Sequence, residues 1–288
     1  MPTIISASRR TDIPAFYMPW FMNRLRAGTV AYPNPFGGQI HTLSLRPEDV
    51  HSIVFWSKFY GPFLRHVDEI LSRGYVFYAH YTITGAPPRL EPKVPRWEQA
   101  VRVFRDLAVR TSPRHVQWRF DPILITDDLD AAYYADRFRE IAAALDGATT
   151  RCYFSFVSYY AKAARRLERA GIRYVDPPLE ARRALVETLV AIAAEHGITL
   201  YACCQADLLD EHVRQAHCVD ADLLAELFPD RPLSGTVQPT RVGCGCFASR
   251  DVGMYDTCPF GCLYCYANAG QTLTHVEHDP HDLMLISR

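Results

Sequence analysis

Short runs of apolar, β-branched and aromatic residues recur along the chain and predict the strands of a buried sheet. Runs of this kind cover residues 4–8, 53–56, 76–82, 116–120, 152–157 and 199–203. Between them, apolar residues recur at three- and four-residue spacing. This spacing predicts amphipathic helices over residues 63–72, 97–109, 131–145 and 180–196. Gly74 and Gly197 each stand between a helix and a strand, as expected of a left-handed helix stop.

Strands that alternate with helices predict an α/β protein with a parallel sheet. At least six such units favour a complete or partial (β/α) TIM-like barrel, with a doubly wound open sheet as the alternative. Residues 30–45 contain Pro33, Pro35 and Gly37-Gly38, which predict an irregular excursion or a small hairpin after the first helix. We therefore expect residues 1–288 to form a single barrel domain.

Composition and charge narrow the classes of protein. Hydrophobic residues make up 49% and charged residues 22% of the chain, which predicts a folded, soluble protein. Its 31 Lys and Arg nearly balance 32 Asp and Glu, so no overall field favours nucleic acid or an anionic membrane. The sequence shows neither a leader pattern nor a run of about eighteen apolar residues, so we expect a cytoplasmic protein without a membrane partner.

Polar residues collect where the predicted strands end, which is where barrel enzymes place their chemistry. Arg9, Arg10 and Asp12 follow the first strand, and Arg119 and Asp121 end the fourth. We expect these five residues to orient an anionic or hydrogen-bonding small-molecule substrate. The alternative is that Arg10 with Asp12, or Arg119 with Asp121, forms a structural ion pair. Other polar residues at strand ends are Lys58, Thr82, Thr84, Ser155, Ser158, Gln205 and Asp207.

Five of the nine cysteines lie between residues 244 and 265, and in a chain of this size clustered thiols favour metal binding over disulfides. Cys258, Cys262 and Cys265 are separated by three and then two residues, and Gly261 permits the tight turn that would aim them at one centre. Three thiolates on an iron–sulfur cluster leave one iron open to a small molecule. Structural zinc is the alternative, because it too favours thiolates.

Cys244 and Cys246 precede this motif and are harder to assign. One of them could be a fourth metal ligand, they could contact the ligands without binding the metal, or they could line the substrate pocket as thiols. We expect at least one of them to lie near the metal. Residues 241–270 thus form a predicted cluster-binding segment. The remaining cysteines are expected to pack in the core: Cys152, Cys203, Cys204 and Cys218.

The three-cysteine motif, with Tyr264 before and Tyr266 after its last cysteine, resembles the signature of radical S-adenosylmethionine (radical SAM) enzymes. The whole chain, from the segment Ser6 to Pro14 onward, also resembles a bacterial family of unknown function with a C-terminal cysteine cluster. The first resemblance implies a four-iron four-sulfur cluster whose open iron binds S-adenosylmethionine, with Tyr264, Tyr266 and Asn268 contacting the cofactor. It also implies a 5′-deoxyadenosyl radical and an external electron donor. Because the motif follows the last predicted units, the barrel would be a permuted one.

Two function classes follow. The first is a radical SAM-like enzyme whose substrate is unknown. The second is a non-catalytic barrel with structural zinc or a fully Cys-ligated cluster, acting in binding or electron transfer. The basic residues between 161 and 173 predict a solvated helix face and are less typical of a nucleic-acid site, because the overall charge is balanced. His80 lies alone in a strand and is expected to be structural.

Overall fold

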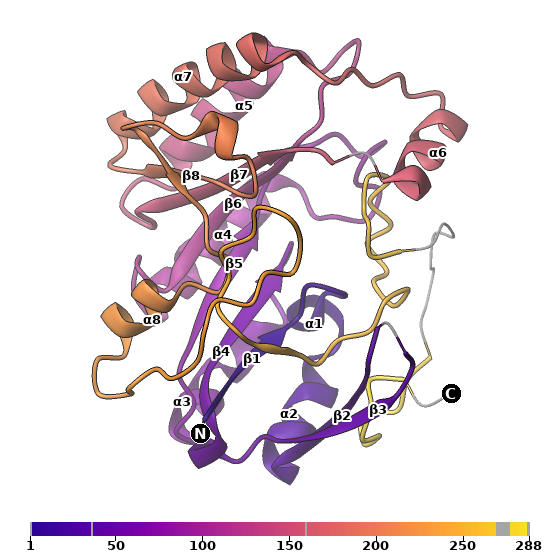
Figure 1. Ribbon diagram of the computed structural model, residues 1–288, viewed down its shortest axis with the longest axis vertical. Helices are drawn as coiled ribbons and strands as arrows, with labels where there is room; N and C mark the ends of the chain where they lie inside the picture. The colour runs from indigo at the N-terminus through magenta and orange to yellow at the C-terminus, as the bar shows by residue number, and fades with distance from the viewer. Residues whose placement is uncertain (1, 36, 159, 269–276, 287–288) are drawn as a thin grey trace.

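The computed structural model describes residues 2–35, 37–158, 160–268 and 277–286, and an eight-stranded sheet forms the centre of the fold (Figure 1). Residues 269–270 of the predicted cluster-binding segment lie outside the described residues. The strand order is β10-β1-β4-β5-β6-β7-β8-β9, and every neighbouring pair is parallel. The bounds are β1 Thr3–Ala7, β4 Val50–Ser57, β5 Phe77–Thr82, β6 Val116–Ile123, β7 Arg151–Phe156, β8 Thr199–Ala202, β9 Val213–Gln215 and β10 Arg250–Asp251. The predicted α/β class and all six predicted strands are confirmed.

The predicted helices and the predicted hairpin are also present. The start of the 63–72 helix is a 3-10 turn, and Gly74 and Gly197 have φ of +85° and +64°, as the left-handed helix stops require. The hairpin consists of β2 Thr29–Pro33 and β3 Ile40–Ser44, which pair antiparallel. The helices are α1 Ile13–Phe16, α2 Met18–Ala27, α3 Val67–Ser72, α4 Trp97–Arg110, α5 Ala131–Ala144, α6 Ala161–Arg169, α7 Leu179–Glu195 and α8 Ala221–Leu227. The 3-10 turns are η1 Pro47–Asp49, η2 Phe63–His66 and η3 Ala206–Leu208.

The two faces of the sheet bury different partners, because successive side chains of a strand point in opposite directions. On one face, which we call the helix face, Ile53 and Phe55 of β4 belong to the main apolar core with residues of α2, α3, α4, α5 and α7. On the other face, which we call the thiol face, Val54 and Trp56 pack in a second cluster. That cluster draws on α8 and on the long segment after β8, coloured orange where it crosses the sheet in Figure 1. The long loops therefore cover the face that the larger helices leave open.

The parallel strands place all their carboxyl ends at one edge of the sheet. Within the described residues, β10 and β9 are the outer strands, so no closed ring of strands is observed. In the same part of the chain, none of the helices is both long enough and apolar enough to span a bilayer. The carboxyl edge is therefore the place to look for the predicted site.

Phe55 tests the helix-face core. Its ring is fully buried and lies edge-on to the rings of Phe21, Phe63 and Phe77, with centroids 4.7 to 5.6 Å apart. Replacing Phe55 with Ala leaves a cavity among three rings, so we expect the free energy of unfolding to fall by about 3–5 kcal/mol. Urea denaturation measures this change. Val109→Ala, at an 86% exposed position, is the control, and an equal loss in both variants would contradict this account of the core.

Candidate functional site

The three-cysteine loop follows β10, so it begins at the carboxyl edge of the sheet. Gly261 has φ of +71°, and the N–H of Cys265 donates to the carbonyl of Cys262 at 3.1 Å, which closes the tight turn expected between the cysteines. Burial raises the pKa of Cys258 and of Cys262, and the nearby Sγ of Cys265 raises both further, so the three thiols lie close to one another. The structure therefore brings together the three cysteines that the sequence predicts to share a centre.

Helix α6 holds this loop from one side, as the gold segment beside α6 in Figure 1 shows. The guanidinium of Arg166 donates to the backbone carbonyl of Leu263 at 2.9 Å, and also to the carbonyls of Cys265 and Asn268. The sequence predicted that the basic residues of this helix form a solvated face. Arg166 departs from this prediction because its side chain contacts the loop. One side chain thus orders three positions of a segment that has no helix or strand.

The predicted cofactor-binding residues also hold the loop. The amide nitrogen of Asn268 donates to the carbonyl of Cys258 at 3.0 Å, and the hydroxyl of Tyr266 donates to the carbonyl of Arg9 at 2.8 Å. Among the described residues, the buried Oδ1 of Asn268 has no hydrogen-bond partner. Asn268 therefore retains one acceptor next to Cys258 that a bound group can use.

Tyr264 connects the loop to a buried ion pair. Its hydroxyl donates to the carboxylate of Glu91, which also accepts from Lys58 Nζ at 2.7 Å and from the hydroxyl of Thr84 at 2.8 Å. Burial lowers the pKa of Lys58, but Glu91 and the neighbouring Cys262 outweigh this effect and hold it above its ordinary value. Lys58 therefore remains a cation beside the cysteines.

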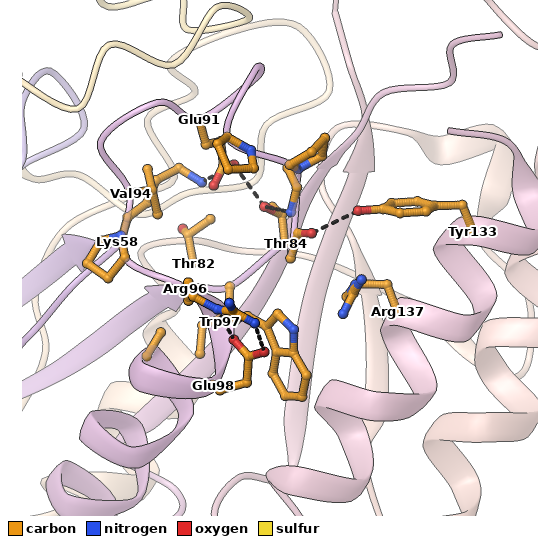
Figure 2. A pocket seen from close by; sticks show the side chains of 17 residues that line it. Lys58, Thr82, Thr84, Glu91, Val94, Arg96, Trp97, Glu98, Tyr133 and Arg137 are labelled. Atoms are coloured by element: carbon orange, nitrogen blue, oxygen red, sulfur yellow. Dashed lines mark hydrogen bonds and ion pairs between the residues drawn. The ribbon is translucent and has the colours of Figure 1, made fainter. Parts of the chain in front are cut away.

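A pocket of about 400 Å³ opens on the far side of this ion pair. Figure 2 shows Lys58, Thr84 and Glu91 at one side of it and Tyr133 and Arg137 at the other. Prolines and the indole of a tryptophan contribute apolar wall between these polar groups. Lys58 and Glu91 thus belong both to the pocket and to the surroundings of the cysteine loop. The full lining is Lys58, Thr82, Ile83, Thr84, Gly85, Ala86, Pro87, Pro88, Glu91, Val94, Pro95, Arg96, Trp97, Glu98, Ala100, Tyr133 and Arg137.

Asp251, the last residue of β10, accepts hydrogen bonds from the first strand and from the residues after it. Its carboxylate accepts from the hydroxyls of Ser6 and Ser8, both at 2.6 Å, and from the N–H of Arg9 at 2.8 Å. Arg10 Nε donates to the same carboxylate at 3.1 Å. Burial opposes ionisation, but Arg10 and Arg9 outweigh it and hold the pKa of Asp251 below its ordinary value. Arg9 and Arg10, expected to orient substrate, therefore contact this carboxylate, and Arg10 does not pair with Asp12.

Asp12 is a structural residue in this arrangement. It is the N-cap of α1, where its carboxylate accepts from the N–H of Ala15 at 3.0 Å. The same carboxylate accepts from the hydroxyl of Ser57 at 2.7 Å and from the N–H of Lys58 at 2.8 Å. Burial raises its pKa to about 6 against the lowering effect of these hydrogen bonds. Asp12 therefore joins α1 to the end of β4, and its oxygens already have protein donors.

Arg119 and Asp121 pair with each other within β6, as the structural alternative predicted. Ser155 of β7 donates to Asp121. Another guanidinium nitrogen of Arg119 donates to the Sγ of Cys218 at 3.1 Å. His80 lies close by: it stacks on the ring of Trp56 and is buried, and this burial lowers its pKa to about 4. These residues belong to the thiol face, where among the described residues the buried Nδ1 of His80 has no hydrogen-bond partner.

Cys244 and Cys246 do not join the three-cysteine loop, so the expectation that one of them would approach it is wrong. They lie in the thiol-face cluster with Cys203 and Cys218, whereas the loop cysteines pack against the helix-face core. The reason is β10: it pairs with β1 after Cys246, so the chain passes the outer strand of the sheet before it reaches Cys258. Cys203, Cys204 and Cys218, expected as packing residues, gather with the displaced pair.

No group of three or more His, Cys, Asp or Glu side chains within the described residues is already arranged around one metal ion. Zinc needs its sulfurs about 2.3 Å from a single point. A four-iron cluster binds each thiolate through a different iron, so it needs thiols around a common space instead. Burial raises the pKa of Cys258 and Cys262, so either metal must displace protons from these thiols.

Glu91, Asp251 and Arg166 are site residues that the sequence did not reveal. Glu91 lies in the loop between β5 and α4, where no hydrophobic period reports burial. The contacts of Asp251 and Arg166 are made with residues about 240 and 100 positions away. A charged residue that stands among apolar neighbours in the sequence can be recognised as a candidate for burial. None of these three residues has such neighbours.

Asp251→Asn tests the carboxylate between the two ends of the chain. Its removal leaves Arg9 and Arg10 without their anion, so we expect unfolding free energy at pH 7 to fall by about 3–5 kcal/mol. The wild-type carboxylate stabilises the fold above about pH 4, and this contribution disappears as pH falls through the lower folded-state pKa. Urea denaturation from pH 7 to 2 should show the gap between variant and wild type closing at acid pH. Asp136→Asn, at an exposed ion pair, is the control, and a gap that stays constant would contradict the assignment.

Arg166→Ala tests how the loop is held. Loss of three donors to backbone carbonyls should raise hydrogen exchange of the backbone amides in residues 257–268, measured by mass spectrometry, by at least tenfold. Arg169→Ala, in the same helix at an exposed position, is the matched control. Equal exchange in the two variants would show that Arg166 does not order the loop.

Comparisons with known proteins identify a family whose function is unknown. A search of curated proteins finds no significant match to this chain. The family model described as Domain of unknown function (DUF1848) matches residues 4–267, from the first strand to the end of the cysteine loop. This range covers most of the 288 residues, so the predicted membership of a family of unknown function is confirmed. The chain belongs to the DUF1848 family.

Proposed function

We propose that this protein is a radical SAM-like iron–sulfur enzyme that acts on a small-molecule substrate. The observation that carries the proposal is the position of Cys258, Cys262 and Cys265. They lie together at the carboxyl edge of a parallel sheet, beside a pocket that shares Lys58 and Glu91 with them. Catalytic sites of α/β folds are built at this edge.

The strand order supports a partial TIM-like barrel, which we propose to be a permuted form of the radical SAM barrel. From β1 through β4 to β8, neighbours in the sheet follow one another along the chain, without the reversal of a doubly wound sheet. The larger helices pack on a single face, as they do outside a barrel. The cysteine loop follows β10, the outer strand beside β1. A loop at the C-terminus of the sequence thus stands next to the first strand of the sheet.

The residues around the three thiols fit an iron–sulfur cluster. The N–H of Ala267 points to the Sγ of Cys265 at 3.3 Å, and Lys58 places a positive charge near Cys262, both of which stabilise thiolate sulfur. The unpartnered Oδ1 of Asn268 offers an acceptor to the amino group of a bound S-adenosylmethionine. When bound, the cluster would supply an electron from an external donor to cleave S-adenosylmethionine to a 5′-deoxyadenosyl radical that abstracts hydrogen from substrate.

The chain's own residues would bind the substrate and keep water out. The three cations of the pocket, Lys58, Arg96 and Arg137, exceed its two carboxylates, Glu91 and Glu98, by one charge, which favours an anionic group. Trp97 and the prolines provide apolar wall. Arg9, Arg10, Asp12, Arg119 and Asp121 already have protein partners, so we assign them to positioning the sheet edge and the loop. A cytoplasmic location belongs to the same proposal, because it keeps clustered thiols reduced.

Anaerobic purification followed by iron and sulfide analysis tests the cluster. We expect about four irons and four sulfides per chain in the wild type. A variant with Cys258, Cys262 and Cys265 all changed to Ala should lose this iron. Cys152→Ala, a buried cysteine outside the loop, is the matched control and should retain it. Stoichiometric zinc at these cysteines, without iron, would support the non-catalytic alternative.

Product analysis tests the chemistry. With S-adenosylmethionine and a strong reductant, the iron-loaded wild type should form 5′-deoxyadenosine at a rate at least tenfold above the triple Cys→Ala variant. Cys152→Ala should keep the wild-type rate. Iron-loaded protein that forms no 5′-deoxyadenosine above the triple variant would leave a cluster without radical chemistry and overturn the enzyme proposal.

A further inference from the structure

Five cysteines, which we call the cysteine ring, gather on the thiol face, apart from the three-cysteine loop: Cys203, Cys204, Cys218, Cys244 and Cys246. The Sγ of Cys203 lies 3.9 Å from that of Cys204 and 3.8 Å from that of Cys218. Cys204 and Cys244 shift each other's pKa, as do Cys218 and Cys246, which places these thiols near one another in the same cluster. Each thiol therefore lies among other thiols, an arrangement that an apolar core has no reason to assemble.

The backbone is shaped to bring these sulfurs together. Consecutive strand residues point to opposite faces, yet Cys203 and Cys204 direct their sulfurs to the same ring. This is possible because β8 ends at Ala202 and Cys204 adopts φ of +57°, a conformation that side chains other than glycine seldom take. Across the ring, Gly243 has φ of +75°, and the N–H of Cys246 donates to the Sγ of Cys244 at 3.4 Å. An uncommon conformation at a cysteine is typical of a functional site.

Arginines surround the ring and indicate that it carries negative charge. Arg241 donates to the sulfurs of Cys204 and Cys203 at 3.0 and 3.4 Å, and Arg119 donates to Cys218 at 3.1 Å. Arg9 lies near Cys218 and Cys246, and among the described residues its buried Nη1 has no acceptor. Arg119 and Arg9 are largely buried, and a positive charge next to a sulfur favours its thiolate form even where the guanidinium also contacts a carboxylate.

We propose that four of these five thiols bind a single zinc ion. Four sulfurs about 2.3 Å from one zinc ion are about 3.8 Å from one another, the spacing that the two measured edges already have. Among the described residues, no three of these thiols already surround a single point, so zinc would require the sulfurs to move. Binding would therefore pull four sulfurs inward and leave the fifth as a thiol donor. This site does not depend on the proposed radical chemistry.

A metal here would hold the covering segment onto the sheet. Between α8 and β10, residues 228–249 contain no helix or strand, only an isolated bridge between Val237 and Phe247. Val242 is 97% exposed, and Leu233 and Phe247 are only partly buried against the cluster, so the apolar packing of this loop next to the cysteines is incomplete. The cysteine ring joins the end of β8, Cys218 three residues after β9, and this loop. One ion would thus replace the packing that the segment lacks.

Metal analysis of anaerobically purified protein tests the proposal. We expect about one zinc per chain in the wild type and in the variant with Cys258, Cys262 and Cys265 changed to Ala. The double variant Cys244→Ser/Cys246→Ser leaves only three ring thiols, so its zinc content should fall at least tenfold. Cys152→Ser is the matched control, because Cys152 is buried outside both groups. Two results would overturn the assignment: a double variant that retains its zinc, or a double variant that loses iron and sulfide.

Thiol alkylation of the wild-type protein keeps the test decisive if the double variant does not fold. With zinc bound, at least four of the five ring cysteines should resist a small alkylating reagent, and a chelator should increase their labelling at least tenfold. Mass spectrometry assigns the labelled positions. Cobalt in place of zinc should show the absorption of a tetrahedral thiolate site. Labelling unchanged by zinc and by chelator would refute the site, whatever the loop cysteines bind.

Discussion

The carboxylate of Asp251 joins the two ends of the chain, and the position of the cysteine loop depends on it. Strand β10 is only two residues long, so its backbone pairing with β1 is brief. Ser6, Ser8, Arg9 and Arg10 add donors to one buried anion at its end. A buried carboxylate is tolerated because these donors and charges compensate its desolvation. The loop that begins beyond Asp251 is consequently fixed above the first strand.

The sheet separates the cysteines into two groups with different surroundings. The loop cysteines lie near Lys58 and Glu91, two residues that also line the pocket. Cys203, Cys204 and Cys218 lie beneath the long covering segment, which carries Cys244 and Cys246. Arg119 and Arg241 contact this group. Arg9 connects the two surroundings: it is 3.9 Å from Asp251, and its guanidinium lies over the ring of Trp56 on the thiol face.

The ion pair of Lys58 and Glu91 gives the pocket a charged boundary next to the loop. Both groups are largely buried, and each has a second contact: Glu91 accepts from Thr84 and Tyr264, and Lys58 lies 5.6 Å from the ring centre of Tyr264. Breaking such a pair leaves a buried charge, so the arrangement is rigid. A rigid boundary allows the pocket and the cysteine loop to keep their relative position.

Local patterns in the sequence determined the strands, the larger helices and the hairpin. The spacing of apolar residues within one element shows which face of that element is buried, and no distant residue is needed to recognise it. Residues 97–109, which predicted α4, are an example. The turn at Gly261 was predicted for the same reason, because the spacing of Cys258, Cys262 and Cys265 and the freedom of glycine are properties of one short segment. The end of each strand also indicated where polar residues would gather.

Only the tertiary structure decided which of these polar residues and thiols meet. Arg10 contacts Asp251, 241 positions away, and not Asp12, while Asp12 caps a helix and joins it to β4. Cys203 and Cys204 meet Cys244 because the loop after α8 crosses the thiol face before β10 reaches the edge. Such partners depend on strand order and on the paths of loops, which arise from the sum of many distant contacts. The spacing of apolar residues in strands and helices, with periods of two and 3.6 residues, carries no information about these partners.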